Sequence, residues 1–192
     1  MRATVSNIDA FREWREDPEA DLPALIARMR STEATEPMLR GRAFAKCLQA
    51  AVLGQSDTLT ADGYTFAFTG DFEIEHFPRR EESREKDYGG IIVPGRCDRV
   101  LGKLIMDDKT TEYFEIERYL EKYQWRFYLD IWQADWFLWN VWECKKMDEP
   151  KAYCVHKMHR ISQYRYPRLE ADCKELAYEF REFAVNTLGW SA

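Results

Sequence analysis

The spacing of hydrophobic residues changes back and forth along this chain, and that change restricts its fold more than any other feature. Apolar residues recur every third or fourth position at 37–54, 112–133 and 167–188, as on one face of a helix. Between these helices they alternate with polar residues or gather in aromatic and β-branched runs, as in strands. The order helix, strands, helix, strands, helix predicts an α/β (mixed α+β) fold with a central mixed β-sheet flanked by helices.

The predicted helices have recognisable ends. Pro37 is a favoured first-turn residue, and Gly54 marks the expected end of the same helix. Two shorter helices precede it, one at 8–16 that Asn7 or Asp9 would cap and one near 22–29. The last helix has the clearest core stripe, which consists of Leu169, Cys173, Leu176, Phe180 and Phe183.

Tight turns and polar stretches divide the rest of the chain into strands. The expected strands are residues 64–68, 96–100, 104–109, 137–144 and 153–160. Residues 69–76 are a candidate extension of the first strand. Residues 78–88 are mostly charged, and we predict a solvated loop there.

Length and composition favour one folded domain. The chain has 192 residues, of which 45% are hydrophobic, so it can bury a core and is too apolar to be disordered. We expect a single domain over 1–192, with a helical extension at 1–36, a core near 37–165 and a C-terminal helix at 166–192. The net charge of -6 argues against a protein that coats nucleic acid, but it leaves room for a local basic groove.

Cysteine spacing and hydropathy narrow the cellular context. The five cysteines form no CxxC pair, so neither a disulfide framework nor a zinc ribbon is expected. No run of about 18 apolar residues occurs, and the N-terminus lacks the apolar block of a signal peptide. We therefore expect a cytoplasmic protein without membrane contact.

Acidic residues and a lysine meet in the first hairpin. Because side chains alternate along a strand, Asp107 and Lys109 share one face with Ile105, and Asp108 is on the other. Asp98, on the preceding strand, is within reach of Asp107 across the hairpin. Two facing carboxylates favour a neutralising cation, and oxygen-rich acidic sites suit Mg²⁺ or Mn²⁺. A lysine beside such an ion can orient water or stabilise developing negative charge.

An ordinary surface hairpin with a salt bridge would carry the same three residues. Two observations favour a site instead. The strand passes abruptly from apolar to acidic residues, and the following helix places Gln124 and Tyr128 one turn apart on one face. For Asp108 we expect a solvated carboxylate that faces away.

Three motifs follow one another in this region. They are GRCD at 95–98 (GxxD), IMDDKT at 105–110 ((D/E)xKT) and QWRFY at 124–128 (QxxxY). Together they resemble the PD-(D/E)xK nuclease superfamily, and more narrowly its RecB-type branch, which includes phage exonucleases and CRISPR-adaptation nucleases. The resemblance covers roughly residues 37–165 and implies a restriction-endonuclease-like core.

The upstream helix departs from that branch. There it often reads G-x-x-x-H-x-x-L-E, whereas residues 41–49 here read GRAFAKCLQ. Ala45 replaces the histidine that would bind metal, and Gln49 replaces the glutamate. The missing ligand would be water, Gln49 or an acid from 71–75. The acids in that segment are Asp71, Glu73 and Glu75.

The resemblance implies a set of site residues, namely Asp98, Asp107, Asp108, Lys109, Gln124 and Tyr128. Asp98 and Asp107 would ligate Mg²⁺ or Mn²⁺, helped by the backbone carbonyl of Asp108. Lys109 would position the attacking water or stabilise the transition state, and the glutamine and tyrosine would support the site or touch DNA. The flanking cations that would bind DNA phosphates are Arg96, Arg99, Lys103, Lys122 and Arg126.

The function that this resemblance implies is metal-dependent hydrolysis of DNA, most simply by an exonuclease acting on duplex DNA in phage recombination or DNA repair. Such a protein works in a bacterial cell or a phage-infected host. Members of the phage group often form rings and pair with a single-strand annealing protein. Two alternatives stay open: a catalytically degenerate nuclease fold that binds DNA or a protein, and an endonuclease.

Two other metal sites are not expected. Cys144, Cys154 and Cys173 are too scattered to hold an iron–sulfur cluster, and we expect buried thiols. His156 and His159 lie three positions apart on a predicted strand, which would place them on opposite faces and prevent them from sharing a metal.

Overall fold

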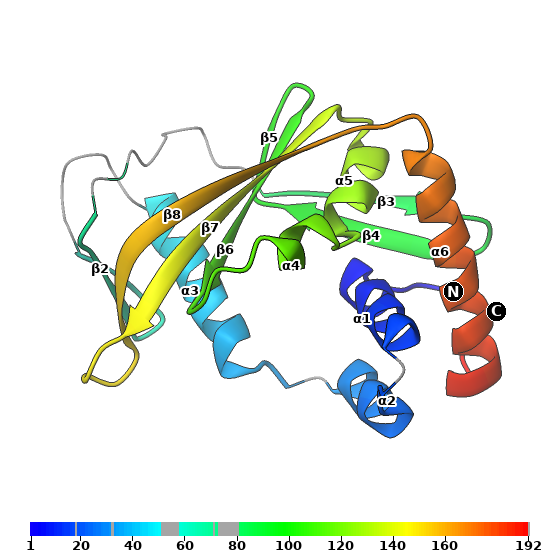
Figure 1. The fold of residues 1–192 in the computed structure, drawn as a ribbon, viewed down its shortest axis with the longest axis horizontal. Helices are drawn as coiled ribbons and strands as arrows, with labels where there is room; N and C mark the ends of the chain where they lie inside the picture. The colour runs from blue at the N-terminus through cyan, green and yellow to red at the C-terminus, as the bar shows by residue number, and fades with distance from the viewer. Residues whose placement is uncertain (18, 32, 51–57, 71, 73–80, 192) are drawn as a thin grey trace.

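The computed structural model describes residues 1–191 except 18, 32, 51–57, 71 and 73–80 (Figure 1). Its helices are α1 (Val5–Glu16), α2 (Leu22–Arg30), α3 (Glu36–Ala50), α4 (Glu117–Leu120), α5 (Gln124–Trp132) and α6 (Leu169–Phe183), with a π-helical turn at Ala184–Leu188. Its strands are β1 (Thr58–Ala61), β2 (Tyr64–Phe68), β3 (Glu82–Asp87), β4 (Ile92–Cys97), β5 (Arg99–Leu101), β6 (Leu104–Thr111), β7 (Trp136–Lys146) and β8 (Ala152–Tyr164). Every described helix is too short or too polar to cross a bilayer.

The described strands form one large sheet and one separate ribbon. The large sheet is mixed, curled and six-stranded, in the order β1-β2-β8-β7-β6-β5. Its β6–β7 and β2–β8 pairs are parallel, and its other pairs are antiparallel. Strands β3 and β4 form a separate two-stranded ribbon, and Ile92 of β4 also makes a parallel bridge to Arg2 near the N-terminus. With helices around this sheet, the predicted mixed α+β fold is confirmed.

Helices pack on both faces of the large sheet. On one face Phe44 of α3 contacts Trp142 of β7, with ring centroids 5.5 Å apart. On the other face Tyr119 of α4 meets Trp139 edge-on at 5.8 Å. Because Trp139 and Trp142 stand three residues apart on one strand, they point to opposite faces. Strand β7 is therefore buried on both faces over most of its length, which explains its long apolar run.

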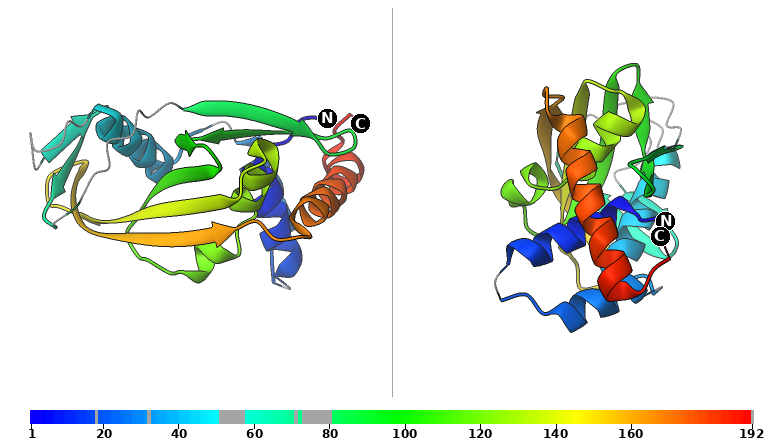
Figure 2. Two further views of the ribbon diagram at one scale, coloured as in Figure 1. Left: turned by 90° about the horizontal axis from the view of Figure 1, so that it is seen from above. Right: turned by 90° about the vertical axis from the view of Figure 1, so that its right-hand side faces the viewer.

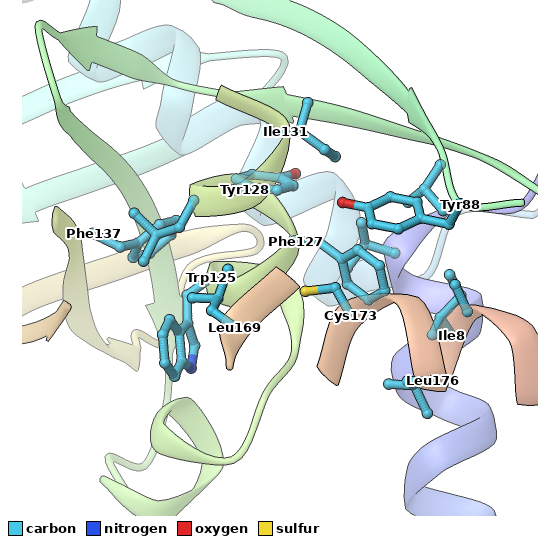
Figure 3. Packing of buried hydrophobic residues seen from close by; sticks show 14 of the residues in the cluster. Ile8, Tyr88, Trp125, Phe127, Tyr128, Ile131, Phe137, Leu169, Cys173 and Leu176 are labelled. Carbon is cyan, nitrogen blue, oxygen red and sulfur yellow. The ribbon is translucent and has the colours of Figure 1, made fainter. Parts of the chain in front are cut away.

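The larger core lies where α1, α5 and α6 meet the sheet and β4 (Figure 3). Ile8 of α1, Phe127 of α5 and Leu176 of α6 are all buried in it. The predicted stripe of the last helix is largely confirmed, since its first four members are buried and Phe183 packs against them while partly exposed. Residues 1–36 are thus tied to the core through α1.

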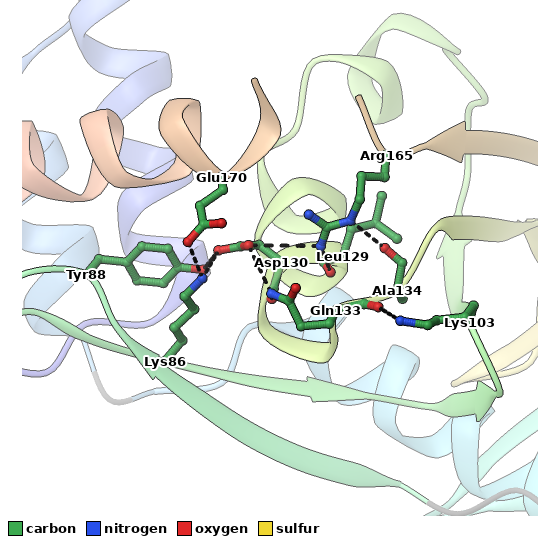
Figure 4. A network of polar contacts seen from close by, with 9 residues as sticks. All are labelled: Lys86, Tyr88, Lys103, Leu129, Asp130, Gln133, Ala134, Arg165 and Glu170. Atoms are coloured by element: carbon green, nitrogen blue, oxygen red, sulfur yellow. Dashed lines mark hydrogen bonds and ion pairs between the residues drawn. The ribbon is translucent and has the colours of Figure 1, made fainter. Parts of the chain in front are cut away.

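Helix α5 lies between the β3–β4 ribbon and the large sheet (Figure 2). A buried carboxylate on this helix, Asp130, accepts hydrogen bonds from Lys86 at 2.9 Å and from Tyr88 at 2.7 Å (Figure 4). Lys86 also donates to Glu170 of α6 at 2.9 Å. This network joins β3, α5 and α6, and so it holds the helix that carries Gln124 and Tyr128.

The prediction of a solvated loop at 78–88 is wrong for residues 82–87. They form β3, which pairs with β4 residue by residue from Glu82↔Cys97 to Asp87↔Ile92. Most of its charged side chains stay exposed, as is common on an edge strand. The backbone hydrogen bonds to β4 determine the structure of this segment, and they cannot be predicted from its number of charged residues. The candidate extension at 69–76 is not a strand at 69, 70 and 72, and its other residues lie outside the described part.

Two helix predictions also need correction. The single helix expected at 112–133 is two helices, α4 and α5, because Asp9 of α1 accepts the backbone N–H of Tyr123 at 2.7 Å between them. Asp9 is therefore buried and does not cap α1. The cap is Thr4, whose hydroxyl accepts from the amide of Asn7. Gly54, the expected end of α3, lies outside the described residues.

Candidate active site

The first hairpin brings two of the predicted acids and the lysine together. Arg99 pairs with Met106 in the β5–β6 ladder, which puts the preceding Asp98 beside Asp107. The Lys109 ammonium forms an ion pair with Asp107. The Asp107 side chain is 3% exposed, whereas that of Lys109 is 37% exposed. The lysine is thus more open to solvent than the aspartate with which it pairs.

The strand that carries Asp98 is interrupted at that residue. We expected a continuous strand at 96–100, but β4 ends at Cys97 and β5 begins at Arg99. The physical reason is a side-chain contact, because Oδ2 of Asp98 accepts the backbone N–H of Asp108 at 2.8 Å. A carboxylate takes the place of a backbone carbonyl, so the chain passes from the ribbon to the large sheet at this point.

Burial and charge shift the pKa of all three groups. Burial raises the pKa of Asp107 to about 7 even though Lys109 opposes the shift, and the neighbouring Asp98 adds to it. Burial also raises the pKa of Asp98. For Lys109, burial works to lower the pKa, but Asp107 and Asp98 outweigh it and hold the pKa above its ordinary value. Two carboxylates that resist ionisation together favour an added cation.

Gln124 and Tyr128 of α5 both reach the hairpin. Nε2 of Gln124 donates to Oδ1 of Asp107 at 3.3 Å. The hydroxyl of Tyr128 donates to the carbonyl of Arg96 at 2.7 Å. Burial and the nearby Asp107 raise the pKa of Tyr128 to about 12, so this phenol stays protonated. The two motif residues therefore orient the acids, one directly and the other through the backbone of β4.

The expectation of a solvated Asp108 carboxylate is wrong. This side chain is 4% exposed, and its Oδ2 accepts from Arg99, itself 5% exposed, at 2.7 Å. Its Oδ1 accepts from the indole N–H of Trp142 at 2.9 Å. The sequence places Asp108 on the face opposite Asp107 correctly, but helix α3 buries that face. The burial of this face depends on the packing of α3 against Trp142, and no local sequence motif predicts it.

The predicted DNA-binding cations fall into two groups. Arg96 and Lys103 are exposed, although Arg96 lies 3.4 Å from Glu81 and Lys103 donates to the carbonyl of Gln133. The other group is turned inward. Its members are Arg99, Lys122 and Arg126.

The inward group has other contacts. Arg99 belongs to the buried pair with Asp108, so its assignment as a DNA contact is corrected. Arg126 donates to the carbonyls of Glu121 and Lys122, and its guanidinium lies 4.3 Å from the Trp125 ring centroid. Burial lowers the pKa of Lys122, which makes no ion pair within the described part of the chain.

A divalent cation fits the two carboxylates. Oδ2 of Asp107 is buried and accepts no hydrogen bond, although Lys109 lies beside it. Mg²⁺ usually takes one or two carboxylates and keeps several waters, so Asp98 and Asp107 meet that requirement. Over the described residues, no three His, Cys, Asp or Glu side chains gather into a metal-binding group. Asp71, Glu73 and Glu75, the candidate further ligands, lie outside those residues.

The two histidines of β8 do not face opposite ways. A β-bulge at Glu143 and Cys144 changes the register, so both histidines approach the Glu143 carboxylate. Nε2 of His159 lies 3.0 Å from it and Nε2 of His156 lies 3.9 Å away. The His159 ring also stacks on Phe114 with centroids 3.6 Å apart. Of the three cysteines expected to be buried thiols, Cys144 and Cys173 are buried and Cys154 is partly exposed, and all five cysteines are free.

Comparison with known proteins gives distant structural likenesses. No protein-family model matches the sequence, and no curated protein matches it. The crystal structure of SSO0001 has a TM-score of 0.46 and 16% identity, over 95% of this chain and 76% of that one. A phage-related exonuclease from Haemophilus somnus 129PT has a TM-score of 0.40 and 13% identity, over 57% of this chain and 62% of that one. Both TM-scores lie below 0.5, so neither likeness assigns a function to this chain.

Proposed function

We propose that this chain is a metal-dependent DNA nuclease that hydrolyses phosphodiester bonds. The observation that carries the proposal is the convergence of the buried carboxylate of Asp107, the partly buried carboxylate of Asp98 and the partly exposed ammonium of Lys109. A surface salt bridge needs no second acid beside a buried one and no glutamine bound to that buried acid. Here Gln124 supplies that hydrogen bond to Asp107. Two neighbouring acids with a partly exposed lysine contribute little to folding stability, but they are the groups that phosphoryl transfer needs.

Each group has a role in such a reaction. Asp98 and Asp107 would hold Mg²⁺ or Mn²⁺, with the backbone carbonyl of Asp108 as a further ligand. When bound, the ion lowers the pKa of a coordinated water and stabilises charge on a phosphoryl oxygen. Lys109 would hold the attacking water or stabilise the charge that develops in the transition state. Gln124 would keep Asp107 oriented, and Tyr128 would keep the strand before Asp98 in place.

The substrate and mode of action follow from the resemblance of the three motifs. We propose duplex DNA as the substrate and cleavage from an end, in the cytoplasm, with Arg96 and Lys103 as exposed phosphate contacts. A ring-shaped homo-oligomer and a single-strand annealing partner belong to the same proposal. An endonuclease is the nearest alternative, and it differs in cutting DNA without ends.

The test compares end-labelled linear duplex with closed circular duplex, in Mg²⁺, Mn²⁺ or EDTA. We expect metal-dependent loss of the linear DNA alone. Lys109→Ala should abolish cleavage and leave the melting temperature nearly unchanged, because this side chain is partly exposed and outside the core. Lys174→Ala, at an exposed position of α6, is the matched control and should cleave normally.

Other outcomes have distinct meanings. Cleavage of the closed circle would replace the exonuclease with an endonuclease. Cleavage by Lys109→Ala at the normal rate would overturn the proposed mechanism. No cleavage with any metal would favour a fold that binds DNA or a protein without cutting, and the alanine at position 45 would then be the first substitution to reverse.

A further inference from the structure

A second pair of charged residues lies next to the two carboxylates in the sequence. Asp98 is followed by Arg99, and Asp107 is followed by Asp108. Successive side chains of β6 point to opposite faces, so Asp107 faces the site and Asp108 faces away, where it meets Arg99, while Asp98 lies at the bend just before β5. The second members form an ion pair of 2.7 Å between side chains that are almost completely buried.

We propose that Arg99 and Asp108 are positioning residues that set the spacing of Asp98 and Asp107 for metal binding. This inference rests on the function proposed above. The pair links β5 to β6 directly beneath the two acids. The indole of Trp142, on β7, holds the other oxygen of Asp108. Three adjacent strands are therefore tied together at one carboxylate.

The backbone of Asp108 connects this tie to the site. Its N–H donates to Oδ2 of Asp98, so the orientation of the Asp108 peptide determines where that carboxylate lies. Its carbonyl is the group that we propose as a further metal ligand. Because Arg99 and Trp142 each hold one carboxylate oxygen of Asp108, the backbone of this residue has little freedom to rotate. The Arg99–Asp108 pair thus acts on the metal through Asp98 and through the peptide, without touching the ion.

Electrostatics explains why the pair contains both charges. An Asp108 carboxylate alone would be a third negative charge close to Asp98 and Asp107. The guanidinium of Arg99, 2.7 Å from that carboxylate, offsets the charge. A buried ion pair is not needed for stability, since apolar residues of similar volume often replace one without loss. We therefore attribute the position of the Arg99–Asp108 pair, next to the two acids, to its effect on their geometry and not to a contribution to folding stability.

The test separates positioning from stability with a double variant. Arg99→Met together with Asp108→Leu removes both charges and fills the space with apolar side chains, so we expect a cooperative melt near that of the wild type. Manganese binding, measured by isothermal titration without DNA, should weaken about 10-fold or more, as is common when groups behind metal ligands are changed. In cleavage assays kcat should fall while KM for DNA stays close to normal.

Two further variants complete the design. Trp142→Phe removes the donor to Asp108 together with part of a buried aromatic ring, leaves the Arg99–Asp108 pair in place and should weaken manganese binding less than the double variant does. Arg40→Met is the matched control, because Arg40 is equally buried but pairs with Glu112, five residues beyond Asp107. It should leave manganese affinity unchanged.

The outcomes distinguish the two proposals. A wild-type protein that binds manganese, with a folded double variant of equal affinity, would overturn the positioning role and leave the nuclease proposal standing. A double variant that melts far below the wild type, with unaltered manganese affinity where it is folded, would reduce the pair to a structural one. A wild-type protein that binds no divalent metal would overturn both proposals.

Discussion

Tyr128 and Arg96 share two hydrogen bonds across the gap between α5 and β4. The phenol donates to the Arg96 carbonyl at 2.7 Å and accepts the Arg96 amide at 3.4 Å. Tyr128→Phe would leave both backbone groups unpaired, at a cost of about 1–2 kcal/mol in the free energy of unfolding. Urea denaturation measures this loss, and cleavage should also slow because Asp98 follows two residues later. Tyr178→Phe, at an exposed position of α6, should change neither quantity.

Gly95 and Gly41 should respond to alanine in opposite ways. A Cβ at Gly95 would lie 2.6 Å from Cζ3 of Trp132 and 3.2 Å from Cε1 of Tyr128, so α5 would have to move. We expect Gly95→Ala to destabilise the protein by about 1–3 kcal/mol. A Cβ at Gly41 would meet only Oγ1 of Thr110, at 3.9 Å, and Gly41→Ala in α3 should stabilise by about 0.5–1 kcal/mol. Thermal melts of the two variants side by side check the contrast.

Divalent-metal binding should depend on the charge of Asp107. Asp107→Asn keeps the shape of the side chain but removes the anionic ligand, so we expect manganese affinity to fall about 10-fold or more. Isothermal titration in the absence of DNA measures it. Asp148→Asn, in the exposed turn between β7 and β8, is the control. Equal affinity in wild type and Asp107→Asn would place the metal elsewhere.

The Asp130 network should be among the most sensitive features of the fold. Asp130 is completely buried, and its loss would leave Tyr88 without its carboxylate partner and Lys86 with only the exposed Glu170. We expect Asp130→Ala to cost about 3–5 kcal/mol. Glu170→Gln removes an exposed partner of the same lysine and should cost less than about 1 kcal/mol. Comparable losses in the two variants, measured by urea denaturation, would contradict the central place given to Asp130.

The contact between Glu143 and His159 predicts an acid-dependent loss of stability. A hydrogen bond from His159 holds the pKa of Glu143 below its ordinary value, so the folded state favours the ionised carboxylate. This stabilisation is complete above the unfolded pKa of about 4.3, and it disappears as the pH falls through the lower pKa of the folded protein. Glu143→Gln should therefore melt below wild type at pH 5.5, and the difference should shrink toward pH 3.

The measurement is thermal melting of both proteins over that acidic range. Glu149→Gln, in the exposed turn after β7, serves as the control and should follow the wild type throughout. A wild-type advantage that grew as the pH fell would contradict the direction assigned to Glu143.

Local patterns in the sequence were sufficient for the elements that have strong periodicity or tight turns. The strand at 64–68, both members of the second hairpin and the stripe of the last helix follow from them. The proximity of Asp98, Asp107 and Lys109 follows as well, because a short hairpin restricts which side chains can meet. The contact between Gln124 and Asp107 is also expected from the sequence, because a helix directly after the hairpin carries Gln124.

Distant contacts decided what those patterns missed. Asp9 divides a region that reads as one helix, because an acid from α1 accepts the amide of Tyr123. Strand β3 forms in a highly charged segment because β4 offers a backbone partner along its whole length. The β-bulge at Glu143 turns two histidines toward one carboxylate, which residue counting along an ideal strand excludes.

The sequence by itself determined the order of the strongly patterned elements and the face of β6 on which Asp107 and Lys109 stand, since both depend on neighbours within a few residues. Only the tertiary structure decided which of the remaining charges are available. Arg99 and Asp108 read as surface residues, yet α3 covers that face of the sheet and turns them into a buried pair. Burial depends on elements far apart in the chain, and it is burial that separates a charge that can reach a substrate from one that holds the site in place.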